Sequence, residues 1–237
     1  MDNLIAKTYK EYFGIELIES EIKELSNKYY LAAKGKYGKL RGFNQALFEE
    51  KMKASKAIYF NVDEIAPLII KSIDLFPDYW KNKKFIEAVS AMNYVLYSRA
   101  VKNKNWLICL TDNPDIKLVD PNAFDLIKRS YKIIAMEVVG IVQREFANAF
   151  TNIVEQVTEE VKNKAKKRYG KDTWLIVNIN ANVASEADIK QISYNILKIK
   201  NNPFCCIVLT NMGIFTREMR MDTLFPKFKL FSFNLKQ

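Results

Sequence analysis

The sequence contains no histidine, and its three cysteines, Cys109, Cys205 and Cys206, show no CxxC spacing. These absences exclude the common zinc sites and every nucleophile pair in which a histidine activates a serine or a cysteine. Any metal ion must therefore be held by oxygen ligands. Because all three cysteines lie in apolar runs, we expect them to be buried as small hydrophobic residues.

The chain also lacks a long apolar run. No stretch approaches the roughly 18 residues needed to span a bilayer, and the start Met1-Asp2-Asn3 has no secretion-signal pattern. Glycine and proline are scarce, with 7 and 6 residues, whereas hydrophobic residues make up 49% of the chain and aromatic residues 13%. This apolar content is enough to form a core. We therefore expect a folded, cytoplasmic protein that does not associate with membranes.

Positive charge is in excess, because 37 lysines and arginines oppose 27 acidic residues and give a formal net charge of +10. This balance favours a polyanionic partner such as nucleic acid, since neutralising phosphates releases counterions. Residues 34–43 combine basic side chains with glycines, and the candidates for nucleic-acid contact there are Lys34, Lys36, Tyr37, Lys39 and Arg41. Glycines admit phosphates to the backbone, and an aromatic ring stacks on a base. The alternative is a solvated connector between helices.

Apolar positions recur at three- and four-residue spacing through the first hundred residues, which predicts helices. The expected helices cover residues 3–13, 19–32, 44–58, 63–75 and 84–101. We divide the chain into a helical region, residues 1–83, and an α/β domain, residues 84–237.

Short apolar runs alternate with helical patterns after about Asn105, which is typical of an α/β unit. Strands are expected at residues 106–110, 131–139, 174–179 and 204–209, with a last edge strand at 227–235. A long helix over about 146–161 and a helix N-capped by Ser185 lie between them. Continuous apolar strands indicate a central, partly parallel sheet that is buried on both faces.

Two carboxylates stand out near the first two predicted strands. Asp115 follows the first strand in the sequence Asp-Asn-Pro-Asp, and Glu137 lies in the second strand. Carboxylates on neighbouring strands are suitable ligands for Mg²⁺, which prefers oxygen and supports attack of water on a phosphodiester. The alternative is an ordinary turn residue beside an unrelated strand carboxylate.

The order of elements resembles the PD-(D/E)XK nuclease superfamily over residues 84–237: a helix, a strand with Pro-Asp, a strand with Glu-Val-Val, a long helix, the Trp-Leu-Ile-Val strand, a helix and a final apolar strand. The resemblance implies a restriction-endonuclease-like α/β domain with a central mixed sheet, and a Mg²⁺-dependent DNA endonuclease of restriction or defence. It also implies that Asp115 and Glu137 bind the metal, joined by Glu87 from the preceding helix.

The superfamily's lysine is missing, because the position two residues after Glu137 holds Val139. Gln143 or Arg144 on the following helix, or Lys117 beside Asp115, could substitute for it. Two alternatives remain open: an inactive nuclease-like module that binds nucleic acid or a partner protein, and a purely structural interaction protein. If the protein is an active nuclease, a homodimer is expected, because cutting both DNA strands is easiest for a two-fold dimer.

Overall fold

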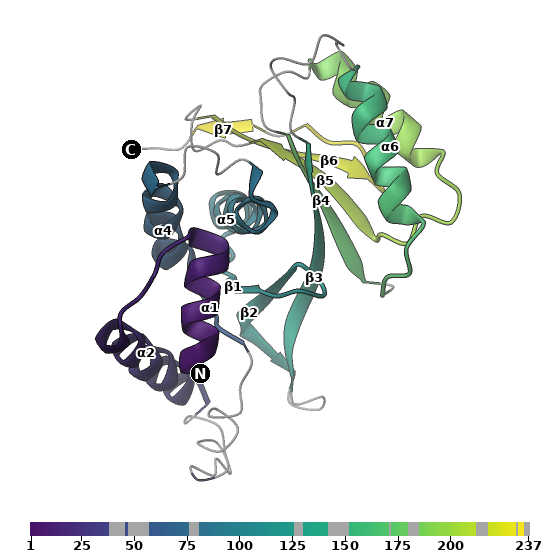
Figure 1. Cartoon of the computed structure of the whole chain (residues 1–237). Coiled ribbons are helices and arrows are strands. Elements are labelled where there is room, and N and C mark those ends of the chain that lie inside the picture. Colours follow the sequence, from purple (N-terminus) through teal and green to yellow (C-terminus); the bar gives the residue numbers. More distant parts are fainter. Residues whose placement is uncertain are drawn as a thin grey trace.

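The computed structural model describes residues 1–37, 46, 57–75, 81–125, 130–141, 152–170, 172–179, 185–211, 218–230 and 232–234. Within these ranges the chain forms six helices and an open mixed sheet of seven strands (Figure 1). The predicted α/β class with a central, partly parallel sheet is therefore confirmed. No helix in the described ranges has both the length and the apolar character required to cross a membrane. The division at residue 83 stays a prediction.

Among the described residues, four helices precede the sheet: α1 Asp2–Phe13, α2 Glu19–Tyr37, α4 Val62–Leu75 and α5 Lys83–Lys102. They confirm the helices predicted at 3–13, 19–32, 63–75 and 84–101. Helix α5 begins where the side chain of Asn82 accepts hydrogen bonds from the backbone of Lys84 and Phe85. The helix predicted at 44–58 falls mostly outside the described residues, and Ala57 and Ile58 at its end are not helical.

The sheet contains the strands β1 Leu107–Leu110, β2 Ile116–Asp125, β3 Ser130–Ile141, β4 Thr173–Ile179, β5 Cys206–Asn211, β6 Glu218–Phe225 and β7 Ser232–Asn234, in that order. Strands β3, β4 and β5 are parallel, and the other neighbours are antiparallel. Helix α6, Ile153–Ala165, connects β3 to β4, and α7, Glu186–Leu197, connects β4 to β5. A capping box of Ser185 and Asp188 begins α7, as predicted for Ser185.

Two strands were not predicted. Strand β2 lies between the two strands that were expected to be neighbours, and β6 precedes the expected edge strand at 227–235. Within the described residues, that edge strand is represented by β7. Polar residues obscure both patterns, together with a proline in β2. Strand β2 reads Ile-Lys-Leu-Val-Asp-Pro-Asn-Ala-Phe-Asp and β6 reads Glu-Met-Arg-Met-Asp-Thr-Leu-Phe. The long helix was expected to begin near 146, but residues 142–151 lie outside the described ranges and α6 begins at Ile153.

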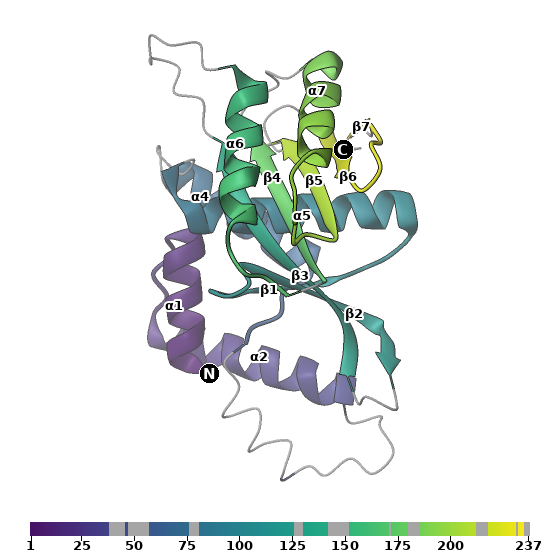
Figure 2. The same ribbon diagram turned by 90° about the vertical axis from the view of Figure 1, so that its right-hand side faces the viewer.

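Helices cover both faces of the sheet (Figure 1). Helices α1, α4 and α5 pack with one face in a large apolar core, and α6 and α7 pack with the other face in a second core. Alternate residues of β4 divide between the cores, Trp174 and Ile176 in the first and Leu175 and Val177 in the second. Figure 2 shows α5 running across the strands, while α6 and α7 run along them.

All three cysteines are free thiols. Cys109 and Cys206 are buried as predicted, but Cys205 is exposed, so the prediction was wrong for Cys205. The chain enters β5 at Cys206, which leaves Cys205 just outside the sheet. Burial raises the pKa of Cys109 to about 11 and that of Cys206 to about 12, which keeps both thiols protonated at neutral pH.

Gly140 of β3 lets α5 approach the sheet closely. A Cβ atom at Gly140 would lie 2.9 Å from Cδ1 and 3.1 Å from Cγ2 of Ile86. Ile86 adjoins Glu87, the predicted metal ligand on α5. The missing side chain at position 140 therefore helps to set how deeply Glu87 is placed against the sheet.

We expect Gly140→Ala to lower the free energy of unfolding by about 1–3 kcal/mol, the usual cost of overpacking a core. Urea denaturation of Gly140→Ala, Ile86→Val and the double variant measures this effect. Ile86→Val removes Cδ1, so the double variant should recover part of the loss. Losses that simply add would contradict a contact between these two residues.

Candidate active site

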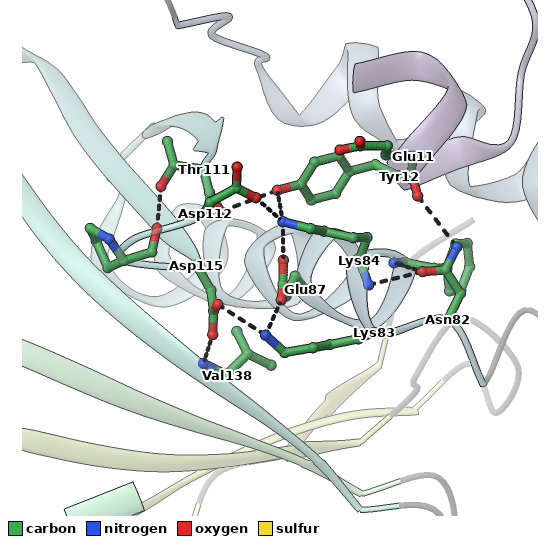
Figure 3. Close-up of polar contacts among 12 residues, drawn as sticks. Glu11, Tyr12, Asn82, Lys83, Lys84, Glu87, Thr111, Asp112, Asp115 and Val138 are labelled. Atoms are coloured by element: carbon green, nitrogen blue, oxygen red, sulfur yellow. Dashed lines mark hydrogen bonds and ion pairs between the residues drawn. The ribbon is translucent and has the colours of Figure 1, made fainter. Parts of the chain in front are cut away.

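The Asp115 carboxylate is anchored to the backbone of β3. Pairing of β2 with β3 ends at Ile116 and Met136, so β3 continues without β2 beside it. There the backbone N–H of Val138 donates a 2.8 Å hydrogen bond to Oδ2 of Asp115 (Figure 3). Asp115 is only 4% exposed. This bond holds the carboxylate next to Glu137, although the two residues belong to different segments.

Lys164 joins Glu137 to Asp115. Glu137 lies on the face of β3 that α6 covers, because it alternates with Met136 and Val138 of the opposite core. Lys164, in the last turn of α6, donates a 2.9 Å hydrogen bond from Nζ to Oε2 of Glu137. The same Nζ lies 3.7 Å from Oδ2 of Asp115. One ammonium group thus stands between the two carboxylates predicted to bind a metal.

Helix α5 brings a third carboxylate and a second lysine to Asp115. The Nζ atom of Lys83 lies 3.3 Å from Oδ1 of Asp115 and 3.0 Å from Oε1 of Glu87 (Figure 3). Glu87 is fully buried, and neither of its oxygens has a hydrogen-bond partner of ordinary geometry among the described residues. Negative and positive groups therefore alternate through the site, from Glu87 through Lys83, Asp115 and Lys164 to Glu137.

Glu87 has an unusual protonation equilibrium. Burial raises the pKa of its carboxyl group to about 7; the Asp115 carboxylate also raises it, while Lys83 and Lys84 act in the opposite direction. Lys84 is shared with other groups, since its Nζ lies 2.5 Å from Oδ1 of Asp112 and 3.1 Å from the hydroxyl of Tyr12. Near neutral pH, Glu87 is therefore divided between its charged and neutral forms.

We expect Glu87→Gln to flatten the pH dependence of stability. The native state holds a proton on Glu87 up to about pH 7, whereas the unfolded chain releases it near pH 4.5. The wild-type free energy of unfolding should therefore fall as the pH rises through this window, by at most about 3 kcal/mol. Urea denaturation in steps across this window, on both proteins, measures the difference. Parallel curves would contradict the raised pKa.

The structure brings together three of the predicted site residues, Asp115, Glu137 and Glu87. Lys117 lies on β2, and among the described residues no ion pair links it to a carboxylate of the site. Gln143 and Arg144 lie outside the described residues, as do Lys39 and Arg41. Helix α2 includes Lys34, Lys36 and Tyr37, but the structure describes only their backbone.

The sequence prediction missed the contribution of Lys164 to the site. Val139, at the position of the missing lysine, is 6% exposed and packs in the core beneath α6. The positive charge comes instead from α6 itself, 27 residues beyond Glu137. Lys164 belongs to a basic run at a helix end, a pattern that the helix dipole already explains. That basic run was the one feature of the sequence that pointed to Lys164, and capping of the helix end explained it equally well.

The described residues contain no group of three Asp, Glu or Cys side chains that could hold a metal ion as it stands. Two features nevertheless suit a divalent cation. Asp115 and Glu137 already share one cationic group, and Mg²⁺ is commonly bound by only one or two carboxylates together with water. Glu87 adds two buried oxygens, which in the described structure face only the ammonium groups of Lys83 and Lys84, at 3.0 Å and 3.8 Å. These donors fit the ion that the sequence predicts.

Comparison with known proteins gives no relative, since no family model, no curated protein and no solved structure matches the chain. The function must therefore be argued from the site itself.

Proposed function

We propose that the protein is a Mg²⁺-dependent endonuclease acting on DNA, with a restriction-endonuclease-like domain over residues 84–237. The main support is the bridge of Lys164 between Asp115 and Glu137. This bridge brings together two carboxylates and a lysine, the combination that the PD-(D/E)XK resemblance implies, although Val139 occupies the usual lysine position. The family resemblance by itself left the site without a positively charged group, because Val139 is apolar.

Each charged group has a role in this proposal. Asp115 and Glu137 would hold the Mg²⁺ ion, and Glu87 would be its third protein ligand. When bound, the ion would supply Lewis-acid stabilisation of the charge that develops on the phosphate. Lys164 lies beside both Asp115 and Glu137, at 3.7 Å and 2.9 Å, so it would stabilise the same developing charge and hold a proton for transfer. Val138 keeps Asp115 in place through its backbone N–H.

The end of α6 supports nucleic acid as the substrate. Lys166, Lys167 and Arg168 are exposed just after Lys164. Lys162 pairs with Glu159 at 3.6 Å, but no ion pair engages Lys167 or Arg168 within the described residues. These positive groups follow Lys164 in the chain. They therefore lie close to the site, where the phosphate backbone of a substrate would approach. Lysine and arginine contacts of this kind orient a nucleic acid without reading its sequence.

Cleavage of a supercoiled plasmid tests the proposal. Wild-type protein should cut the plasmid with Mg²⁺ or Mn²⁺ and stop in EDTA. Glu137→Gln keeps the shape of the side chain and an acceptor for Lys164, but it removes the charge that holds the metal. Cleavage by Glu137→Gln at the wild-type rate would show that the site is assigned wrongly.

A nuclease-like module that binds nucleic acid or a partner protein without cutting is the second candidate. It is favoured by the ion pairs themselves, because Lys83 and Lys164 already neutralise the carboxylates without a metal. This candidate predicts salt-sensitive DNA binding that persists in EDTA, together with no cleavage under any divalent cation.

A further inference from the structure

Lys83 is an exposed side chain whose charge rests on two buried carboxylates of the site. The side chain is 67% exposed, yet its Nζ atom lies 3.0 Å from Oε1 of Glu87 and 3.3 Å from Oδ1 of Asp115, whose side chains are 0% and 5% exposed (Figure 3). The side chains of the other site lysines, Lys84 and Lys164, are only 26% and 15% exposed. Because the head group of Lys83 can return to water with little rearrangement, Lys83 is the counter-ion that leaves the site most readily.

The neighbouring Lys84 is held by groups outside this pair of carboxylates. Its Nζ donates to Oδ1 of Asp112 at 2.5 Å and to the hydroxyl of Tyr12 at 3.1 Å, and it lies 4.9 Å from the centroid of the Tyr12 ring. Within the described residues, the ion pairs of Lys83 are confined to Glu87 and Asp115. A cation that binds these two carboxylates would therefore release Lys83 and leave Lys84 in place.

The position of Lys83 in α5 favours an anion once the carboxylates are taken. Peptide dipoles make the first turn of a helix positive, so acidic side chains are stabilising there. Each of the other five described helices has an acidic residue in its first turn, whereas α5 has none and begins with Lys83 and Lys84. The released ammonium group would stand at this positive end, beside the metal, where a phosphate oxygen can pair with it.

We propose that Lys83 is a phosphate-binding residue that is stored on Glu87 and Asp115 while the site is free of metal, and that turns to the phosphate backbone of nucleic acid when a divalent cation takes its place. The inference rests on the proposed function, since it requires that the carboxylates bind a metal ion and that a phosphate lies beside it. One ammonium group cannot serve both partners. Metal binding should therefore create a nucleic-acid contact that the metal-free protein lacks.

Calorimetric titration of the whole chain with Mn²⁺, without nucleic acid, tests the storage of Lys83 on the carboxylates. Lys83→Met removes an ammonium group that competes with the metal, so the dissociation constant for Mn²⁺ should fall by roughly threefold to tenfold. Lys83→Gln removes the same charge but keeps a hydrogen-bond donor for Glu87, and it should change the affinity in the same direction. Thermal unfolding without metal establishes that each variant is folded.

Fluorescence anisotropy of a labelled DNA duplex tests the contact with phosphate. In Ca²⁺, which also takes carboxylate oxygens as ligands, both Lys83 variants should bind the duplex roughly threefold to tenfold more weakly than the wild type. The slope of log affinity against log salt concentration should become shallower by about 1, as for the loss of one phosphate contact. In EDTA the wild-type ammonium group is held by the carboxylates, so its removal should matter no more than the removal of a distant lysine.

Lys23→Met is the matched control for that distant lysine. Lys23 lies on α2, its side chain is 66% exposed, and it pairs at 2.7 Å with Glu19, four residues away, as Lys83 pairs with Glu87. The same charge is removed from a similar ion pair. Mn²⁺ binding should not change, and any effect on DNA binding should be the same in Ca²⁺ and in EDTA.

The outcomes separate this inference from the nuclease proposal. Mn²⁺ binding that is unchanged or weakened in both Lys83 variants would overturn the inference and leave the nuclease proposal intact. A loss of DNA affinity that is equal in Ca²⁺ and in EDTA would do the same. The expected changes in Mn²⁺ and DNA binding, together with no plasmid cleavage by the wild type, would support the inference and contradict the nuclease. A wild-type chain that binds no Mn²⁺ would overturn both.

Discussion

Replacing Asp115 should abolish metal-dependent cleavage, whereas its effect on stability should depend on the residue introduced. Asp115→Asn and Asp115→Ala both remove a charge that would hold the metal, so each should lower the cleavage rate by roughly 10³-fold or more, the equivalent of several kcal/mol of lost stabilisation. Asp115→Asn keeps an oxygen that can accept from the backbone of Val138, and Asp115→Ala does not.

The two variants therefore differ in folding. Asp115→Ala leaves the Val138 N–H buried without an acceptor, so it should be less stable than Asp115→Asn by about 1–3 kcal/mol. Initial cleavage rates and urea denaturation measure the two effects separately. Asp112→Asn is a close control, because Asp112 lies on the same turn but its side chain is 74% exposed. Equal stability of the two Asp115 variants would contradict the anchoring bond.

Replacing Lys164 with methionine should slow cleavage by roughly 10²-fold to 10³-fold, the usual effect of losing a donor that stabilises developing charge. Mn²⁺ should bind more tightly, on the order of tenfold, because an ammonium group no longer competes for Asp115 and Glu137. Opposite changes in rate and metal affinity would identify Lys164 as the catalytic substitute for the missing lysine. A purely structural ion pair predicts no loss in the maximal rate.

Lys162→Met is the control for this change, because it removes a lysine from the same helical turn whose side chain is 50% exposed and pairs only with Glu159 in the described structure. Cleavage under saturating Mn²⁺ and calorimetric titration should leave this control close to the wild type. A Lys164→Met protein that cleaves at the wild-type maximal rate would remove Lys164 from the mechanism.

The regular parts of the fold could be predicted because periodicity and apolar runs record them directly. Strand β2 was not predicted because it contains Asp120, Pro121 and Asn122, residues that are typical of a loop. The structure accommodates them where the register shifts between Asp120 and Phe124, so proline lies at an irregular position and costs the ladder little. A local pattern cannot reveal that tolerance, since it depends on how β3 lies alongside.

The site was predictable only in part. The order of elements pointed to Asp115, Glu137 and Glu87. Lys83 also left a signal that was not used, because it precedes Glu87 by four residues and such pairs meet on one face of a helix. Lys164 left no comparable signal, since its contact with Glu137 depends on where the end of α6 lies relative to β3.

The seven strands follow one another across the sheet in the order of the chain. Each new strand therefore adds to a neighbour made just before it, and no strand has to insert between two that are already paired. Contacts between near neighbours in sequence close small loops, which favours rapid folding. The contact between Asn93 of α5 and Thr210 of β5 is different, because it spans 117 residues. We expect the sheet to form strand by strand from β1 during synthesis. Helix α5 can complete its packing against β5 only after β5 has left the ribosome.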